Sequence, residues 1–206
     1  MASIYDIKPA FQSLLRPTVN TFSKWNIQAN QVTVFTCLIS MSVGFFVWQT
    51  NGSRLSLVLV PVWLFLRMAL NAIDGMLARE HNQKSNLGAI LNELTDVISD
   101  VFLYLPFAVL PSIDPQLIVV LVLLSVISEM AGITAIQIRA SRRYDGPMGK
   151  SDRAFIFGVL SLLFVFDVSL DGWINFVLWG VIVLLIFTVF NRCSKALIEA
   201  RTRTKL

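Results

Sequence analysis

The sequence predicts an all-α integral membrane protein, in which six transmembrane helices follow an N-terminal amphipathic helix that lies in the membrane interface. Three observations carry this prediction: a high apolar content, a series of long apolar segments, and an uneven distribution of lysine and arginine. The 206 residues are 55% hydrophobic and only 15% charged, with a mean hydropathy of +0.69. Because water-soluble domains carry about 25% charged residues, the apolar segments are best placed in a bilayer.

Six apolar segments have the length that a membrane crossing requires. About 20 residues of helix span the hydrocarbon core, and a helix satisfies its own backbone groups in lipid. The segments predicted to span are residues 32–50, 55–78, 87–111, 115–138, 154–170 and 174–195.

The distribution of lysine and arginine predicts the orientation of these spans. One set of loops and both termini carry nearly all the cations, whereas the opposite loops offer Arg54 beside Asp114, Asp167 and Asp171. By the positive-inside rule both termini face the cytoplasm. This topology explains the basic residues better than a nucleic-acid partner does, and no nucleic-acid binding is expected. The cytoplasmic set is Lys8, Arg16, Lys24, Arg79, Lys84, Arg139, Arg142, Arg143, Lys150, Arg153, Arg192, Lys195, Arg201, Arg203 and Lys205.

Residues 1–30 are predicted to form the interfacial amphipathic segment, and residues 31–206 the six-helix membrane domain. Apolar residues recur before the first span at spacings of three and four, which is the pattern of one helix face. Basic residues interrupt them, as in helices that lie on a membrane surface and contact its lipids. The apolar set is Ile4, Ile7, Phe11, Leu14 and Leu15.

Polar residues stand at helical spacing where the second and third spans approach the cytoplasm. Asn92, Asp96 and Asp100 are four residues apart and share a helix face, because four residues complete about one turn. Asn71 and Asp74 share a face of the preceding span. A short link makes the two spans antiparallel neighbours, so these faces can meet. Carboxylates there need cations, and Mg²⁺ typically joins a few carboxylates to substrate phosphates.

The same stretch resembles the signature of the class I CDP-alcohol phosphatidyltransferase family, including its enterobacterial inner-membrane members of unassigned acceptor. Asp74-Gly75-Met76-Leu77-Ala78-Arg79 is followed, after the eight residues 80–87, by Gly88, and Asp96 then occupies the last aspartate position. Upstream, Asn30 and Thr33 are similar to the N-x-x-T element of the family. The resemblance implies that Asp74, Gly75, Ala78, Arg79, Gly88, Asn30 and Thr33 bind CDP.

The resemblance also implies a metal site and a catalytic base. Family members hold two divalent ions, usually Mg²⁺ or Mn²⁺, with four aspartates, and the last aspartate, here Asp96, acts as the general base. This chain departs from the pattern at two places, where Asn71 and Asn92 stand for aspartates. The predicted metal set is Asn71, Asp74, Asn92, Asp96 and Asp100, with one or two ions. Asp100 is either a substitute ligand or a buried, hydrogen-bonded carboxyl, and Glu93 is less well aimed.

A second basic stretch, residues 138–158, is predicted to bind the acceptor. It resembles a segment of phosphatidylinositol-phosphate synthases whose basic residues hold the acceptor's phosphate, and cations beside a helix start favour anions. The candidates are Arg139, Lys150 and Arg153. Contact with anionic lipid is the alternative.

The expected function is transfer of a phosphatidyl group from CDP-diacylglycerol to the hydroxyl of a small polar acceptor, with release of CMP, in phospholipid biosynthesis. A phosphorylated polyol such as glycerol 3-phosphate or inositol phosphate is the expected acceptor, and the resemblance implies an inner-membrane homodimer among membrane lipids. One alternative is a CDP-lipid-binding member with weak or no turnover, because Asn71 and Asn92 remove two carboxylates. Another is a small transporter, although the charges cluster at the span ends and not at the midplane.

Overall fold

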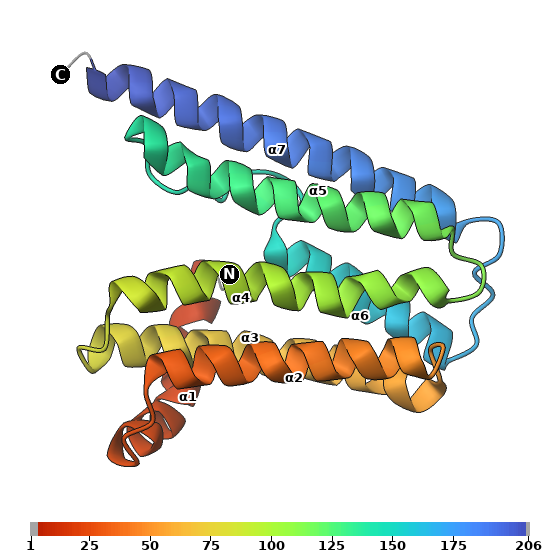
Figure 1. The fold of residues 1–206 in the computed structure, drawn as a ribbon, viewed down its shortest axis with the longest axis horizontal. Coiled ribbons are helices and arrows are strands. Elements are labelled where there is room, and N and C mark those ends of the chain that lie inside the picture. The colour runs from red at the N-terminus through yellow and green to blue at the C-terminus, as the bar shows by residue number, and fades with distance from the viewer. Residues whose placement is uncertain (1–3, 205–206) are drawn as a thin grey trace. The chain divides into compact units, whose positions relative to one another are not determined.

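The computed structural model describes residues 4–204, with side chains described for residues 10–203, and every regular element in this range is helical. Figure 1 shows the helices in chain order. Their bounds are α1 Ile4–Lys24, α2 Ala29–Gln49, α3 Arg54–Glu80, α4 Asn86–Tyr104, η1 Leu105–Val109, α5 Pro115–Thr134, η2 Ala135–Ile138, α6 Lys150–Val165 and α7 Ile174–Thr204. Lys205, counted above among the cytoplasmic cations, and the side chains of Ile4, Ile7 and Lys8 lie outside the described residues.

The all-helical class is therefore confirmed, and a helix stands at each predicted span. Four helical segments in the described part of the chain are long and apolar enough to cross a membrane: Ala29–Gln49, Arg54–Glu80, Pro115–Ile138 and Ile174–Arg203. The crossing of the two other predicted spans, at α4 and α6, stays a prediction, as does the placement of α1 in the membrane interface.

The helix ends follow from particular residues. Pro106 lies in the first turn of η1, where the predicted third span changes from α-helix to a 3-10 helix. The helix at the predicted span 154–170 begins earlier than predicted. This helix, α6, begins at Lys150 because the backbone N–H of Gly149 donates to the Asp152 carboxylate at 2.8 Å. Asp114 caps α5 by accepting from the N–H of Gln116 at 2.9 Å. Such caps satisfy the backbone donors that a helix start leaves unpaired.

Asparagines end three of the helices. Asn26, Asn51 and Asn82 have φ values of 57°, 47° and 57°, and they follow α1, α2 and α3 respectively. Asparagine tolerates this left-handed conformation better than most side chains, so each one turns the chain out of its helix.

The chain forms two compact units, and several helices contribute to both. One unit comprises Met1–Ser42 and Val62–Ser99, and the other comprises Val43–Pro61 and Asp100–Leu206. Pro61, inside α3, stands at a border between them. Since proline has no backbone N–H, α3 lacks one helical hydrogen bond at this border.

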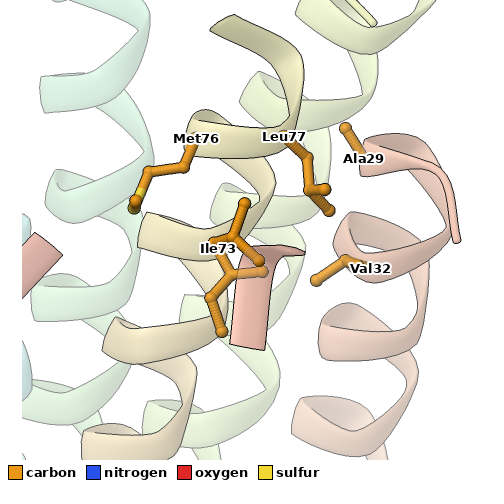
Figure 2. Packing of buried hydrophobic residues seen from close by; sticks show 6 residues of the cluster. Ala29, Val32, Ile73, Met76 and Leu77 are labelled. Carbon is orange, nitrogen blue, oxygen red and sulfur yellow. The ribbon is translucent and has the colours of Figure 1, made fainter. Parts of the chain in front are cut away.

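The first unit is held together where α1, α2 and α3 meet. Figure 2 shows Ala29 and Val32 of α2 facing Ile73 and Leu77 of α3. Val19 of α1 completes this side of the cluster and is fully buried. Farther along the same two helices, Trp63 donates its indole N–H to the Ser40 hydroxyl at 2.9 Å. These contacts fix the start of α2 against the second half of α3.

The second unit packs α5 along α7 (Figure 1) and places aromatic rings between other helices. The rings of Tyr104 and Phe157 stack with centroids 4.1 Å apart, and Phe107 meets Phe157 edge-on at 5.0 Å. On α2, the backbone at Gly44 approaches α4 so closely that a Cβ would lie 1.9 Å from the carbonyl oxygen of Phe102. Small residues permit this kind of close helix approach within membranes.

We predict that Gly44→Ala destabilises the protein, whereas the matched variant Gly180→Ala does not. A methyl group at Gly44 collides with the backbone of α4, while a Cβ at Gly180 in α7 has no atom within 4 Å. Overpacking typically costs about 1–3 kcal/mol. Thermal unfolding of both variants in detergent should show a lower Tm for Gly44→Ala alone, and equal melting of the two would contradict the close helix contact.

Candidate functional site

An open pocket of about 720 Å³ lies in the first unit, where α2 begins, α3 ends and α4 begins. The short link between α3 and α4 closes one side of it. Polar and small side chains dominate the lining, in contrast to the apolar remainder of these helices. The lining residues are Ala29, Asn30, Thr33, Asn71, Asp74, Gly75, Ala78, Arg79, Gln83, Lys84, Ser85, Asn86, Gly88, Ala89 and Asn92.

The pocket brings together all seven residues that the sequence predicts to bind CDP. It also contains three members of the predicted metal set, Asn71, Asp74 and Asn92. A fourth member, Asp96, follows Asn92 by one turn on α4 and contacts Asn71. The fifth, Asp100, belongs to the second unit, where its carboxylate meets Arg153.

Asp74 is the acidic residue that lines the pocket. It is 5% exposed, and its Oδ2 accepts a hydrogen bond of 2.7 Å from the Thr33 hydroxyl. Because a buried carboxylate costs free energy unless it is hydrogen-bonded or paired, this contact between α2 and α3 stabilises the ionised group. The Thr33 side chain thus has a specific partner in the site.

Asp96 is held by two side chains of α3. The amide Nδ2 of Asn71 donates to Asp96 Oδ1 at 3.2 Å, and Arg67 Nη2 lies 3.5 Å from the same oxygen. Arg67 also donates to the backbone carbonyl of Asp96 at 3.0 Å, and its own side chain is nearly buried. The resemblance did not point to Arg67, and its position two turns before Asp74 is the signal that could have done so.

Gly88 keeps one position of the pocket wall free of a side chain. A Cβ on Gly88 would lie 2.7 Å from Asn30 Oδ1 and 3.1 Å from the Ser85 hydroxyl, so any larger residue would push these polar groups aside. Gly75 lies beneath the guanidinium of Arg79, whose nearest nitrogen would be 3.3 Å from an added Cβ. The absence of a side chain at Gly75 therefore gives the Arg79 guanidinium room beside α3.

The link between α3 and α4 contributes residues that the sequence analysis did not assign to the site. Gln83 Oε1 accepts from the backbone N–H of Ala29 at 2.7 Å and so ties the link to the start of α2. Ser85 Oγ accepts from the N–H of Gly88 at 3.0 Å and caps α4. A serine just before an apolar segment is a recognised helix-start signal, whereas nothing in the sequence marks Gln83.

The predicted acceptor residues lie in the second unit and in different surroundings. Arg139 is exposed, with φ 61°, and its carbonyl accepts from Arg203 at 3.0 Å. Lys150 begins α6. Arg153 is 1% exposed, and its Nη2 lies 3.0 Å from Asp100 Oδ2 and 2.9 Å from Glu129 Oε1.

Glu129 of α5 is the centre of a buried arginine cluster. Besides Arg153, it pairs with Arg192 of α7 at 3.3 Å and with Arg142 of the following loop at 3.4 Å. Arg192 also donates to the backbone carbonyl of Ser128. From its sequence context Arg192 is predicted only as a cytoplasmic cation, because its partners on α5 are more than sixty residues away.

A second set of ion pairs orders the loop that precedes α6. Asp145 accepts from Arg143 and Lys195, each at 2.8 Å. Burial raises the pKa of Asp145, but the hydrogen bonds from Lys195 and Arg143 outweigh it and hold the pKa below its usual value. Asp145 is therefore a firmly ionised anchor between the loop and α7.

Within residues 4–204, no group of three or more His, Cys, Asp or Glu side chains is placed to hold a metal ion. Around the pocket, carboxylates and amide oxygens are interspersed instead. The formal charge of the lining is set by Asp74 against Arg79 and Lys84.

Comparison with known proteins gives a consistent result. A family model described as CDP-alcohol phosphatidyltransferase matches residues 26–190. Inner membrane protein YnbA of Escherichia coli (strain K12) is 44% identical over 197 residues, which cover 95% of this chain and 97% of that protein. An uncharacterized protein of Aquifex aeolicus (strain VF5) is 36% identical over 104 residues, covering 50% of this chain and 49% of its own.

Two solved structures share the fold. Both are of Mycobacterium tuberculosis phosphatidylinositol phosphate synthase (PgsA1). The complex with manganese and citrate has a TM-score of 0.70 at 17% identity, covering 87% of each chain. The structure with CDP-DAG bound has a TM-score of 0.64 at 18% identity, covering 89% of this chain and 92% of the other.

We predict that Thr33→Val destabilises the first unit more than Thr36→Val does. The two threonines are both buried on α2, but only the Thr33 hydroxyl is bonded to the Asp74 carboxylate, while that of Thr36 bonds the carbonyl of Val32 in its own helix. A hydrogen bond to a charged group contributes about 1.5–3 kcal/mol. Thermal unfolding in detergent measures the difference, and equal Tm values would show that Asp74 does not depend on Thr33.

Proposed function

Because the chain belongs to the CDP-alcohol phosphatidyltransferase family, we propose that it transfers the phosphatidyl group of CDP-diacylglycerol to the hydroxyl of a small polar acceptor, releasing CMP. Its enzyme class, a phosphotransferase for substituted phosphate groups, follows from family membership. The donor, the acceptor and the roles of individual residues are the proposal.

The observation that carries the proposal is the composition of the pocket. Arg79 and Lys84 bring two positive charges to a lining whose acidic residue is Asp74, and Gly88 leaves the backbone of α4 accessible beside Asn30. A guanidinium binds phosphate through several donors at once, and a glycine lets phosphate approach the chain closely. Such a pocket suits the pyrophosphate of a CDP-lipid, the ligand named for one of the solved neighbours.

The donor atoms of the site fit a hard divalent cation. Asp74 and Asp96 are carboxylates, and Asn71 and Asn92 carry amide oxygens, so all four offer the oxygen ligands that Mg²⁺ and Mn²⁺ take. Manganese is present in the other solved neighbour. When bound, such an ion would neutralise pyrophosphate charge and stabilise the leaving CMP.

Asp96 is the proposed general base. Its carboxylate, positioned by Asn71 and Arg67, accepts the proton of the acceptor hydroxyl as the hydroxyl oxygen attacks the phosphorus that carries the diacylglycerol. A bond forms between that oxygen and phosphorus, and the bond to the bridging oxygen of the pyrophosphate breaks. The bridging oxygen leaves with CMP, and the lipid becomes a phosphodiester.

The proposed acceptor is a phosphorylated polyol, such as glycerol 3-phosphate or inositol phosphate, bound by Arg139, Lys150 and Arg153. Positive charge supports this class of acceptor. Three arginines, Arg142, Arg153 and Arg192, gather at Glu129, so cations concentrate in this part of the second unit. The alternative for this stretch is contact with anionic lipid headgroups.

We further propose an inner-membrane homodimer with both termini and the pocket on the cytoplasmic side. Four helical segments of the described chain can span a membrane, and the Escherichia coli relative is named as an inner membrane protein. The lysines and arginines concentrate at the termini and in the loops after α3 and before α6, which the positive-inside rule assigns to the cytoplasm. Dimerisation is expected from the family resemblance.

A second candidate function is binding of CDP-diacylglycerol without appreciable turnover. The observation that favours it is the neutral character of Asn71 and Asn92, which leaves Asp74 as the acid that lines the pocket. Equilibrium binding of CDP-diacylglycerol without CMP release, across the whole acceptor panel and with both metals, would establish this alternative.

We predict acceptor-dependent CMP release from CDP-diacylglycerol by the purified protein with Mg²⁺ or Mn²⁺, and its loss in Asp96→Asn. General-base catalysis typically contributes about 10²–10⁴-fold, so the variant should fall by that factor while still binding CDP-diacylglycerol. The panel contains glycerol 3-phosphate, inositol phosphate, inositol and serine.

The matched control for this assay is Asp171→Asn, which makes the same chemical change in the loop before α7, where Asp171 bonds Ser112. It should release CMP at the wild-type rate. Wild-type turnover in Asp96→Asn would exclude Asp96 as the base, and a preference for inositol or serine would exclude the phosphorylated acceptor.

A further inference from the structure

We propose that α1 positions the link between α3 and α4 through the contact of Ser23 with His81, and thereby sets how tightly the pocket binds the phosphates of its nucleotide. The inference rests on the proposed function for the identity of the ligand. It makes binding depend on a helix that contributes no residue to the described lining of the pocket.

The link between α3 and α4 is short and is anchored at two places in the pocket wall. Gln83 accepts from the backbone N–H of Ala29 at 2.7 Å, and Ser85 accepts from that of Gly88 at 3.0 Å. Lys84 stands between these two anchors and lines the pocket. The place of its cation therefore depends on the path that the link takes.

The third anchor of the link comes from α1. Ser23 Oγ lies 2.9 Å from Nδ1 of His81, the first residue of the link, and both side chains are half-buried. Arg16 of the same helix pairs with Glu80, the last residue of α3, at 3.2 Å. Two polar contacts thus join α1 to the point where α3 ends and the link begins.

Apolar packing holds α1 in the place from which it makes these contacts. Val19 is fully buried in a cluster with Met76 and Leu77 of α3, and Leu15 and Phe22 pack against the same cluster. These three residues of α1 are three and four positions apart, so they form one helix face. Burial of that face fixes α1 against the end of α3.

The two polar contacts differ in strength. The side chains of Arg16 and Glu80 are 56% and 36% exposed, and exposed ion pairs contribute little because water and salt screen them. The contact of Ser23 with His81 is half-buried and acts on the link itself. Ser23 and His81 are therefore positioning residues, which act on the phosphates through Lys84 and not by touching them.

Amide hydrogen exchange of the link tests the inference without any nucleotide, because it measures local opening. In the purified protein in detergent, Ser23→Ala should raise the exchange rates of residues 81–85 by about 2–10-fold, the factor expected for the loss of one hydrogen bond. His81→Leu should do the same. His81→Asn keeps a polar atom in the place of Nδ1 and should exchange at nearly the wild-type rate.

Nucleotide affinity is the second measurement, with CDP and Mn²⁺ in a calorimeter. The Kd of CDP should rise in Ser23→Ala and His81→Leu by up to the same factor, because molecules with a displaced link bind less well. The Kd of cytidine, which carries no phosphate, should stay unchanged. A protein that was merely less stable would not distinguish the two ligands.

The matched control is Ser13→Ala, which makes the same change on α1, where the hydroxyl bonds the carbonyl of Ala10 in its own helix at 2.7 Å. Exchange of the link and the Kd of CDP should both keep their wild-type values. Arg16→Gln should have a smaller effect than Ser23→Ala, since the ion pair that it removes is exposed.

Unchanged exchange of residues 81–85 in folded Ser23→Ala would overturn the inference, and so would raised exchange with an unchanged Kd for CDP. If Ser23→Ala does not fold, His81→Leu decides the matter by the same two measurements. Absence of CDP binding in the wild-type protein would contradict the proposed function alone, because the exchange measurement still decides whether α1 positions the link.

Discussion

A buried charge in this chain requires a partner from another helix, and the arrangement of both units depends on that constraint. Ionised groups are costly in an apolar helical protein unless they are paired or hydrogen-bonded. The first unit meets this cost at Asp74 with Thr33, which joins α2 to α3, and at Asp96 with Arg67 of α3. The second unit meets it at Glu129, whose arginine partners come from α6, α7 and a loop. In each case the charge also determines which helices are neighbours.

The two units pair their charges with different consequences. In the second unit, acids and arginines contact one another directly, and removing one partner would leave a buried charge uncompensated, which typically costs about 3–5 kcal/mol. In the first unit, the pocket acid Asp74 meets a neutral hydroxyl, and most other polar lining residues are amides. The ion pairs of the second unit favour rigidity, because each acid in them has an arginine partner. The pocket of the first unit is lined mostly by neutral polar side chains, which present hydrogen-bond donors and acceptors to a ligand.

Local sequence patterns predicted the helices and the lining of the pocket, whereas partners between distant segments could not be read from them. Apolar length and capping residues are local, so a helix was found at each predicted span, and the spacing of Asp74, Gly88 and Asn92 placed all three in one pocket. The boundaries moved where a single side chain decides them, as at Pro106 and Asp152. The contacts of Glu129 with Arg192 and of Gln83 with Ala29 depend on packing between segments that are far apart in the chain. A single sequence carries no signal for such packing.

The effect of Asn71 and Asn92 on the site depends on the residues around them and not on the amide group alone. An amide in place of a carboxylate could simply weaken a metal site, and composition alone would support that view. The structure adds that the Asn71 amide is hydrogen-bonded to the Asp96 carboxylate, and that Arg67 supplies positive charge at the same oxygen. Restoring a carboxylate at one position would therefore create repulsion unless an ion entered with it. The amide of Asn71 and the guanidinium of Arg67 thus both act on Asp96, whose charge is compensated by a hydrogen bond and by a fixed positive charge.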